Sequence, residues 1–207
     1  MSEMEEDKWW KTQFERLKST PEVWILQADS LIRAFDILAK AGEDGIREHL
    51  AQMQNEEETP LVYTPRIDSV ALMQGGYAIE VLLKGLALTK PTVVKNMEEG
   101  DNAVSRTLLS HRLRELAKLA GVALTKEENF LCQRLEEFVF WAGRYPAPKN
   151  HAPLKPQPLP QKKGRAPLTA SWSTDFQNIR NLLTKLRQMS GVPLPGTLMT
   201  NLLSDDA

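Results

Sequence analysis

The sequence has very little cysteine or histidine. Cys132 is the only cysteine among 207 residues, which excludes an internal disulfide and favours a reducing compartment. It lies among apolar residues without a thiolate-stabilising neighbour, so we predict a core residue rather than a nucleophile. His49, His111 and His151 are far apart and form no zinc-binding spacing with that cysteine. We therefore expect no metal and no cofactor.

An excess of one charge and a long apolar run are also missing. The 26 basic and 27 acidic residues nearly cancel, so contact with a polyanion would depend on local basic patches. No apolar run approaches the roughly 20 residues that a membrane span requires. The acidic start, Met1 to Asp7, lacks the order of a secretory signal. We expect a cytoplasmic protein that does not contact membranes.

Common enzyme motifs are absent as well. The chain has no Gly-rich phosphate loop between a strand and a helix, and no Gly-x-Ser-x-Gly elbow. Ordinary kinases, dehydrogenases and hydrolases are therefore not supported by the sequence.

Apolar residues recur at helical spacing along most of the chain, and no segment alternates apolar and polar residues as a strand does. The length and the 42% hydrophobic content fit one domain with appendages. We predict an all-α helical bundle over residues 19–191, an amphipathic extension over 1–18 and a C-terminal tail over 192–207. Trp9 and Trp10 lie on the extension, where they would dock on this chain or on a partner.

One segment, residues 68–88, is apolar nearly all round, which predicts the central and most buried helix. Three glycines interrupt it: Gly75, Gly76 and Gly85. Each costs about 1 kcal/mol relative to alanine inside a helix, so we expect close approach of another backbone to offset them. Glu80 and Lys84 stand four residues apart on the polar stripe, where their side chains can pair.

Start and stop signals delimit the other helices. Ser19 to Glu22 begins one helix, Ser110 caps a short one, Thr125 and Glu128 form a capping box, and a last helix starts near Asp175. Glycine is favoured just after a helix. We accordingly expect these four helices to end at Gly42, Gly121, Gly143 and Gly191.

A proline-rich basic loop precedes the last helix. Residues 146–167 contain seven prolines, five Lys or Arg residues and no acidic residue. This composition forbids a helix and favours extended backbone.

Several short motifs stand in a suggestive order. Ala78-Ile79-Glu80 and Leu83-Lys84 lie on the apolar helix, His111-Arg112-Leu113 opens a later helix, and Arg144-Tyr145-Pro146 closes the next. This order resembles the HEPN family, the helical domains of higher eukaryotes and prokaryotes associated with nucleotide binding. The resemblance spans residues 66–190. It implies a bundle of four to five helices, usually a homodimer, that associates with nucleotides or RNA.

These positions also suggest a polar binding site made of Glu80, Lys84, His111, Arg144 and Tyr145. An imidazole at a helix N-terminus lies beside free N–H groups that attract anions. Arg144 offers a fork for phosphate, and Tyr145 a ring for stacking. A structural role is the alternative for each of these residues. His111 would then only cap a helix, Glu80 and Lys84 would form a structural pair, and Arg144 would bind helix-end carbonyls.

Many HEPN proteins, the resemblance implies, are metal-independent ribonucleases. An Arg stabilises the phosphorane charge, and a His separated from it by four to six intervening residues moves the ribose proton. Arg106 to His111 and Arg144 to His151 match this spacing. However, neither pair is a good copy of the nuclease motif. Arg106 precedes the expected helix, and prolines follow Arg144. The last helix contains Arg180-Asn181, but no histidine follows them there.

We therefore expect a noncatalytic, dimeric module that binds a nucleotide or RNA. One alternative is a metal-independent ribonuclease, a toxin or phage-defence effector, that uses His111 with Arg106 or Arg144. Another is a structural adaptor that docks other proteins through Trp9, Trp10 and the proline-rich loop.

Overall fold

The computed structural model describes residues 3–54, 67–160 and 163–193. Within these ranges the predicted all-α class is confirmed, because regular structure is helical apart from one two-stranded hairpin. The helices are α1 (Glu3–Ser19), α2 (Pro21–Gln54), α3 (Asp68–Leu88), α4 (Pro91–Glu98), α5 (Asn102–Leu108), α6 (Leu113–Leu119), α7 (Lys126–Glu137) and α8 (Asp175–Met189). Two further turns are η1, a π-helical turn (Phe138–Ala142), and η2, a 3-10 turn (Ala152–Leu154).

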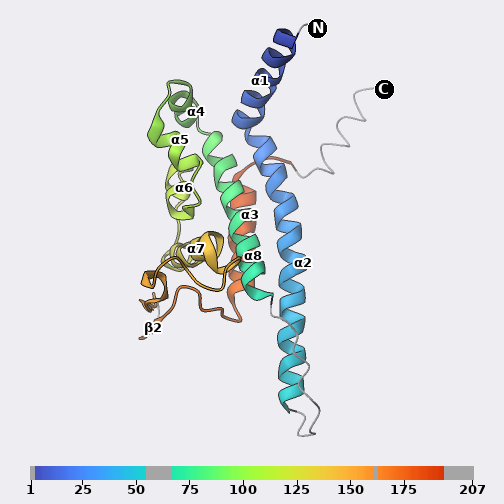
Figure 1. The fold of residues 1–207 in the computed structure, drawn as a ribbon, viewed down its shortest axis with the longest axis vertical. Helices are drawn as coiled ribbons and strands as arrows, with labels where there is room; N and C mark the ends of the chain where they lie inside the picture. The colour runs from blue at the N-terminus through green and yellow to red at the C-terminus, as the bar shows by residue number, and fades with distance from the viewer. Residues whose placement is uncertain (1–2, 55–66, 161–162, 194–207) are drawn as a thin grey trace, which may run out of the picture.

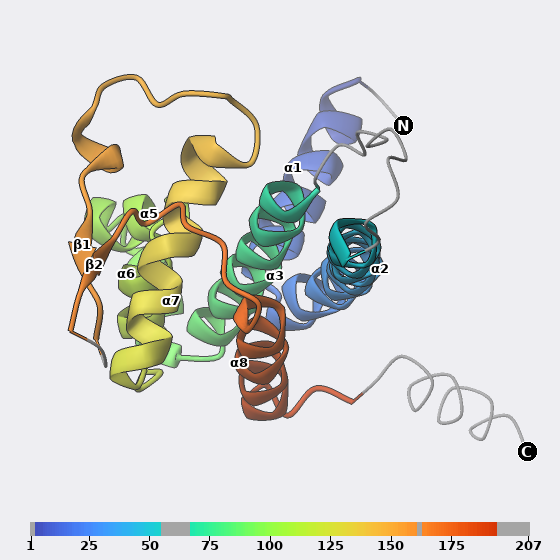
Figure 2. The same ribbon diagram turned by 90° about the horizontal axis from the view of Figure 1, so that it is seen from below.

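The apolar helix α3 lies at the centre, as its composition predicts. It runs opposite to α2, with α8 beside it and α6 and α7 on its other flank (Figures 1 and 2). Of its 21 residues, 15 are buried. The expectation that no apolar segment approaches the length of a membrane span is wrong for α3. Among the described helices, α3 is long and apolar enough to cross a membrane, but 72% of its apolar window is buried inside the protein. Its apolar surface is therefore covered by the neighbouring helices.

The glycine signals for helix ends are right at three positions and wrong at one. Gly121 and Gly191 follow α6 and α8 with φ of 70° and 64°, the left-handed conformation that glycine favours. Gly143 follows η1, which closes the α7 segment. By contrast, α2 continues through Gly42 to Gln54. A Cβ at Gly42 would lie 3.3 Å from Asp68 Oδ1 and from the Phe176 ring, so this glycine permits close helix packing.

Two helices occupy a segment that the sequence pattern left as a connection. Pro91 stands at the start of α4, and the Asp101 side chain caps α5 by accepting from the backbone N of Ala103 at 2.7 Å. The expected cap of the next helix is wrong, because α6 starts at Leu113 and Ser110 lies outside it. The capping box of Thr125 at the start of α7 is confirmed.

The proline-rich loop contains no α-helix among its described residues, in agreement with its composition, but it is not wholly irregular. Strands β1 (Gln157–Pro158) and β2 (Arg165–Ala166) form a small antiparallel hairpin. Arg165 supports it by donating to the Pro156 carbonyl from Nε at 3.0 Å and Nη2 at 2.8 Å. The sequence gives no alternation that predicts strands this short. The central part of the loop, 161–162, and the tail after residue 193 lie outside the described residues.

A buried arginine fixes the end of this loop to the helices. Arg134 of α7 pairs with Asp175 at the start of α8, with Nη1 and Oδ1 2.6 Å apart, and both side chains are almost fully buried. Arg134 also donates to the carbonyls of Leu168 and Ala170 and lies 3.7 Å above the Trp172 ring. The loop therefore returns to one fixed point beside α7.

The glycines of α3 allow neighbouring elements to approach. A Cβ at Gly76 would lie 2.6 Å from Val139 Cγ2, and one at Gly85 would lie 2.8 Å from Ile25 Cγ1. The nearest atoms are thus side-chain atoms, whereas the nearest backbone atom at Gly85 is the Pro21 carbonyl oxygen at 3.4 Å. The expected close approach is present, although side chains rather than backbone make most of it.

We predict opposite effects for alanine at two helical glycines. Gly76→Ala should lower the free energy of unfolding by about 1–3 kcal/mol, because the stiff Val139 side chain has little room to move. Gly45→Ala in α2, where no atom lies within 4 Å of the new Cβ, should raise it by about 0.5–1 kcal/mol. Urea unfolding measures both. Equal stability of the two variants would contradict this packing.

Candidate functional site

Two charged side chains of α3 are buried together. Glu80 and Lys84 are 4% and 7% exposed, and Lys84 Nζ donates to Glu80 Oε1 at 2.7 Å. The i to i+4 spacing on the helix brings the two groups to the same face. The predicted pairing is confirmed. Because isolated charges are costly to bury, each side chain depends on the other.

His111 reaches the same carboxylate from the segment between α5 and α6. Its Nδ1 lies 2.8 Å from Glu80 Oε2, and its side chain is 46% exposed. A carboxylate only accepts hydrogen bonds, so Nδ1 carries the donated proton. In the neutral ring this leaves the Nε2 lone pair free to accept. Glu80 therefore fixes both the orientation and the tautomer of a half-exposed imidazole.

Two aromatic rings lie near this imidazole. The Tyr77 and Phe140 ring centroids lie 6.3 and 6.1 Å from that of His111, both in edge-on orientation. Phe140 is 44% exposed. Tyr77, Glu80, Lys84, His111 and Phe140 together are called the His111 cluster below. Sequence reasoning missed both rings, although Tyr77 stands three residues before Glu80 and so shares its face of α3.

The predicted anion site at the start of the next helix is occupied by the protein itself. Glu136 of α7 accepts from the backbone N of Arg114 at 3.0 Å and from its Nη2 at 3.0 Å. Glu136 is buried, whereas His111 lies before the α6 cap residue, Arg112. The alternative role of His111 as the helix cap is therefore wrong, because the cap residue is Arg112, and Glu136 takes one of the N–H groups at this helix start. The partner of His111 is a carboxylate.

Arg144 has the structural role that the alternative interpretation gave it. Its Nη2 donates to the carbonyls of Val139 at 2.8 Å and Phe140 at 3.1 Å, at the end of η1. Tyr145 is 57% exposed, and Arg144 Cζ lies 5.5 Å from its ring centroid. Both His111 and Arg144 thus contact Phe140, the first through its ring and the second through its carbonyl. Arg144 and Tyr145 make no described contact with Glu80 or Lys84.

The two Arg–His pairs with nuclease-like spacing are not joined. Arg106 is exposed on α5, where its Nε donates to the Asn102 carbonyl at 3.0 Å. His151 is exposed at the start of η2. Among the contacts of described residues, none links Arg106 to His111 or Arg144 to His151.

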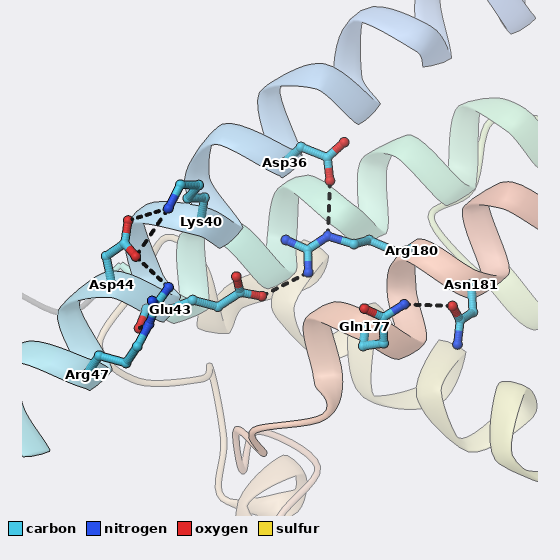
Figure 3. A network of polar contacts seen from close by, with 8 residues as sticks. All are labelled: Asp36, Lys40, Glu43, Asp44, Arg47, Gln177, Arg180 and Asn181. Carbon is cyan, nitrogen blue, oxygen red and sulfur yellow. Dashed lines mark hydrogen bonds and ion pairs between the residues drawn. The ribbon is translucent and has the colours of Figure 1, made fainter.

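Arg180, noted in the sequence because Asn181 follows it, belongs to a separate polar network between α8 and α2 (Figure 3). Its Nε lies 3.2 Å from Asp36 Oδ1 and its Nη1 2.8 Å from Glu43 Oε1. The hydrogen bond with Glu43 is the main reason that the pKa of Arg180 is raised. Asn181 accepts from Gln177 at 2.8 Å. This arginine therefore connects two helices.

Cys132 is a core residue, as its surroundings in the sequence predict. It is 0% exposed, and burial raises the pKa of its thiol to about 12. The thiolate that nucleophilic chemistry needs is therefore scarce at neutral pH.

No family model, curated protein or solved structure matches this chain. The resemblance to the HEPN family therefore rests on the motifs alone and stays a prediction. Within the described ranges, no group of three or more His, Cys, Asp or Glu side chains is placed to hold a metal ion. The chemistry that the cluster can offer is that of an oriented imidazole beside aromatic rings.

We predict strong coupling between the two buried charges. Glu80→Leu should lower the free energy of unfolding by about 3–5 kcal/mol, because it leaves the buried Lys84 charge without its ion-pair partner. Lys84→Met should lower it by less, because Glu80 keeps its contact with His111. The double variant should lose less than Glu80→Leu alone, since an apolar pair suits the core. Denaturant unfolding of the four proteins gives the coupling energy. Simple additivity of the two losses would contradict the mutual dependence.

Proposed function

We propose that the chain is a noncatalytic HEPN-like module that binds a nucleotide or a segment of single-stranded RNA at the exposed side of the His111 cluster. The observation that carries this proposal is the half-exposed imidazole that buried Glu80 holds at 2.8 Å. With Nδ1 occupied, Nε2 can accept a hydrogen bond from a ribose hydroxyl or a base amino group. Such a fixed acceptor favours binding because it loses little freedom when a ligand arrives.

Exposed rings near this imidazole supply surfaces for bases. Phe140 contacts the His111 ring and is 44% exposed, and Tyr145, five residues further along the chain, is 57% exposed. Proteins bind single-stranded RNA largely by stacking unpaired bases on such rings. Unlike paired bases, those of a free nucleotide or a single strand are accessible to this contact.

The loop that follows Tyr145 supplies positive charge. Its described basic residues, all exposed, are Lys149, Lys155, Lys163 and Arg165. Residues 146–167 contain no carboxylate that would oppose a phosphate. Contacts of this kind position a nucleic acid without reading its sequence, and they weaken as salt rises.

We predict salt-sensitive binding that depends on Tyr145 and on the loop. Fluorescence anisotropy with a labelled RNA of about 12 nucleotides and with a fluorescent ATP, at about 50 and 200 mM salt, should show weaker binding at the higher salt. Tyr145→Ala should raise the Kd roughly tenfold through lost stacking. Lys155→Glu should also weaken RNA binding, whereas the same change at the exposed Lys95 of α4 should have little effect.

Absence of binding to either probe at the lower salt would reject the proposal. Equal losses in Lys155→Glu and Lys95→Glu would instead indicate a diffuse charge effect and would remove the loop from the site.

A second candidate function is metal-independent ribonuclease activity. The specific support is again the Glu80–His111 hydrogen bond, because a carboxylate that orients an imidazole is a common arrangement for a general base. The arginine that would stabilise the charge on the phosphate is the weaker part of this candidate mechanism. Nη2 of Arg144 donates to carbonyls, and Arg106 lies on α5. Catalysis would need one of these guanidinium groups to reach a phosphate.

Incubation of the purified chain with RNA in a chelator separates the two functions. The binding proposal predicts intact RNA under conditions in which the anisotropy assay shows a complex. Cleavage that His111→Ala abolishes would favour the nuclease, whereas cleavage that survives His111→Ala would exclude His111 as its acid or base.

A further inference from the structure

A shallow hollow of about 680 Å³ runs along one face of α2, from Asp29 to Asp44. Among the described residues, those that line it all belong to α2 and recur at steps of three and four, the spacing of a single helix face. Its apolar lining consists of Ile32, Ile37 and Ala41, and Ile37 is 63% exposed. The described helices therefore leave this part of α2 uncovered.

Helix α8 borders this face and runs antiparallel to α2. Its Arg187 pairs with Asp29 at 2.8 Å, and its Arg180 pairs with Asp36 at 3.2 Å, two turns further along α2 (Figure 3). A segment that turns back after α8 therefore runs along α2 in the direction from Asp29 to Asp44.

The chain makes this turn at the end of α8. Gly191 has a φ of 64°, and Arg187, one turn before it, donates to the carbonyls of Val192 and Pro193. Val192 packs against the core. Because the same arginine pairs with α2 where the hollow begins, Pro193 lies beside that end of the hollow. Residues 194–207, outside the described residues, follow directly from this point.

The sequence of this tail combines an apolar stripe with an acidic end. Apolar residues at positions i, i+1, i+4 and i+5 would share one side of a helix: Leu198, Met199, Leu202 and Leu203. Residues 194–207 contain two acidic residues, Asp205 and Asp206, and no basic one. So short a helix is unstable alone in water, so it needs a surface that covers its apolar side.

The far end of the hollow offers positive charge. Lys40 Nζ and Arg47 Nη2 contact the Asp44 carboxylate at 2.9 and 2.6 Å, so two cations, each 69% exposed, share one anion (Figure 3). Arg33, on the same face, makes no ion pair among the described contacts, whereas the other two carboxylates of the face pair with arginines of α8. Glu48 follows Arg47 by one position and points about 100° away around the helix.

We propose that residues 194–207 lie in this hollow of their own chain and run parallel to α2. The apolar stripe then packs on Ile37 and Ala41, and the acidic end lies beside Lys40 and Arg47. Packing of this kind would remove apolar surface from water on both segments. The tail thereby becomes a further helix of the bundle, joined to α8 by the turn at its end.

The tail has the length that this placement needs. An extended segment from Pro193 to Thr197, followed by a helix to Asp205, spans about 25 Å. Arg47 lies 18 residues after Asp29, or about 27 Å along α2. The acidic residues therefore reach the basic end of the hollow without strain.

A second uncovered apolar face, on α1, suits the tail less well. Its side chains are 48%, 58%, 60% and 55% exposed and belong to Trp9, Trp10, Phe14 and Leu17. Leu17 precedes Asp29 by 12 residues, about 18 Å, in the direction opposite to the turn after α8. Residues 3–7 beyond these rings include four acidic residues, which would repel an acidic tail.

A spin label on the full chain tests the proposal. Ser204→Cys, on the polar side of the tail, takes the label, because Cys132 is 0% exposed and burial raises the pKa of its thiol to about 12. Relative to the reduced label, the amide signals of residues 37–44 should lose most of their intensity, whereas that of the exposed Leu109 should not. Leu202→Asp should restore the signals of residues 37–44, but Thr200→Asp, the same change outside the stripe, should not.

Charge exchange tests the register. Lys40→Glu/Arg47→Glu and Asp205→Lys/Asp206→Lys should each restore much of the lost intensity through like-charge repulsion. Combining all four changes should bring the loss back, because opposite charges then face each other again. Lys95→Glu on α4 should leave the loss in place. Circular dichroism at 222 nm checks that each variant keeps its helices.

Full intensity at residues 37–44 in the labelled parent chain would overturn the proposal, since another molecule or solvent would then occupy the hollow. Loss at Trp10 and Phe14 in place of residues 37–44 would assign the tail to α1 and would also overturn it. So would a combined charge variant that does not recover the loss. None of these outcomes depends on whether the chain binds RNA.

Discussion

A carboxylate buried on the most apolar helix of the chain constrains the structure around it. Glu80 is 4% exposed on α3, so it needs partners that compensate for the loss of water. Lys84, one turn later, provides the first, and His111, 31 residues away in sequence, provides the second. The segment before α6 is thereby fixed against α3, and an otherwise unremarkable surface histidine acquires one orientation and one tautomer.

Close packing around α3 decides where these groups meet. Gly76 lets Val139 of η1 approach the helix, and Gly143, whose Cβ would lie 2.5 Å from Met73 Cβ, lets the end of η1 do the same. The π-helical turn then presents Phe140 to the His111 ring and its carbonyl to Arg144. Glycine positions that look like helix breakers or stops in the sequence thus serve to bring the aromatic wall of the cluster to the imidazole.

The sequence predicts what depends on local chemistry. Helical periodicity predicts α3 and α8, the Thr125 capping box predicts the start of α7, and i to i+4 spacing predicts the Glu80–Lys84 pair. Contacts between distant segments leave no such signal. Nothing near Arg114 indicates that Glu136 occupies the start of α6, and nothing near Gly42 indicates that α8 packs there and lets α2 continue. Tyr77 and Phe140 become part of the candidate site only through the fold.

The central claim, that Glu80 fixes the His111 ring, can be measured directly by long-range ¹H–¹⁵N correlation of the histidine side chains in the folded protein at alkaline pH. The account predicts that the neutral His111 ring carries its proton on Nδ1, with Nε2 as the unprotonated nitrogen. A proton on Nε2, or averaging between the two tautomers, would contradict it.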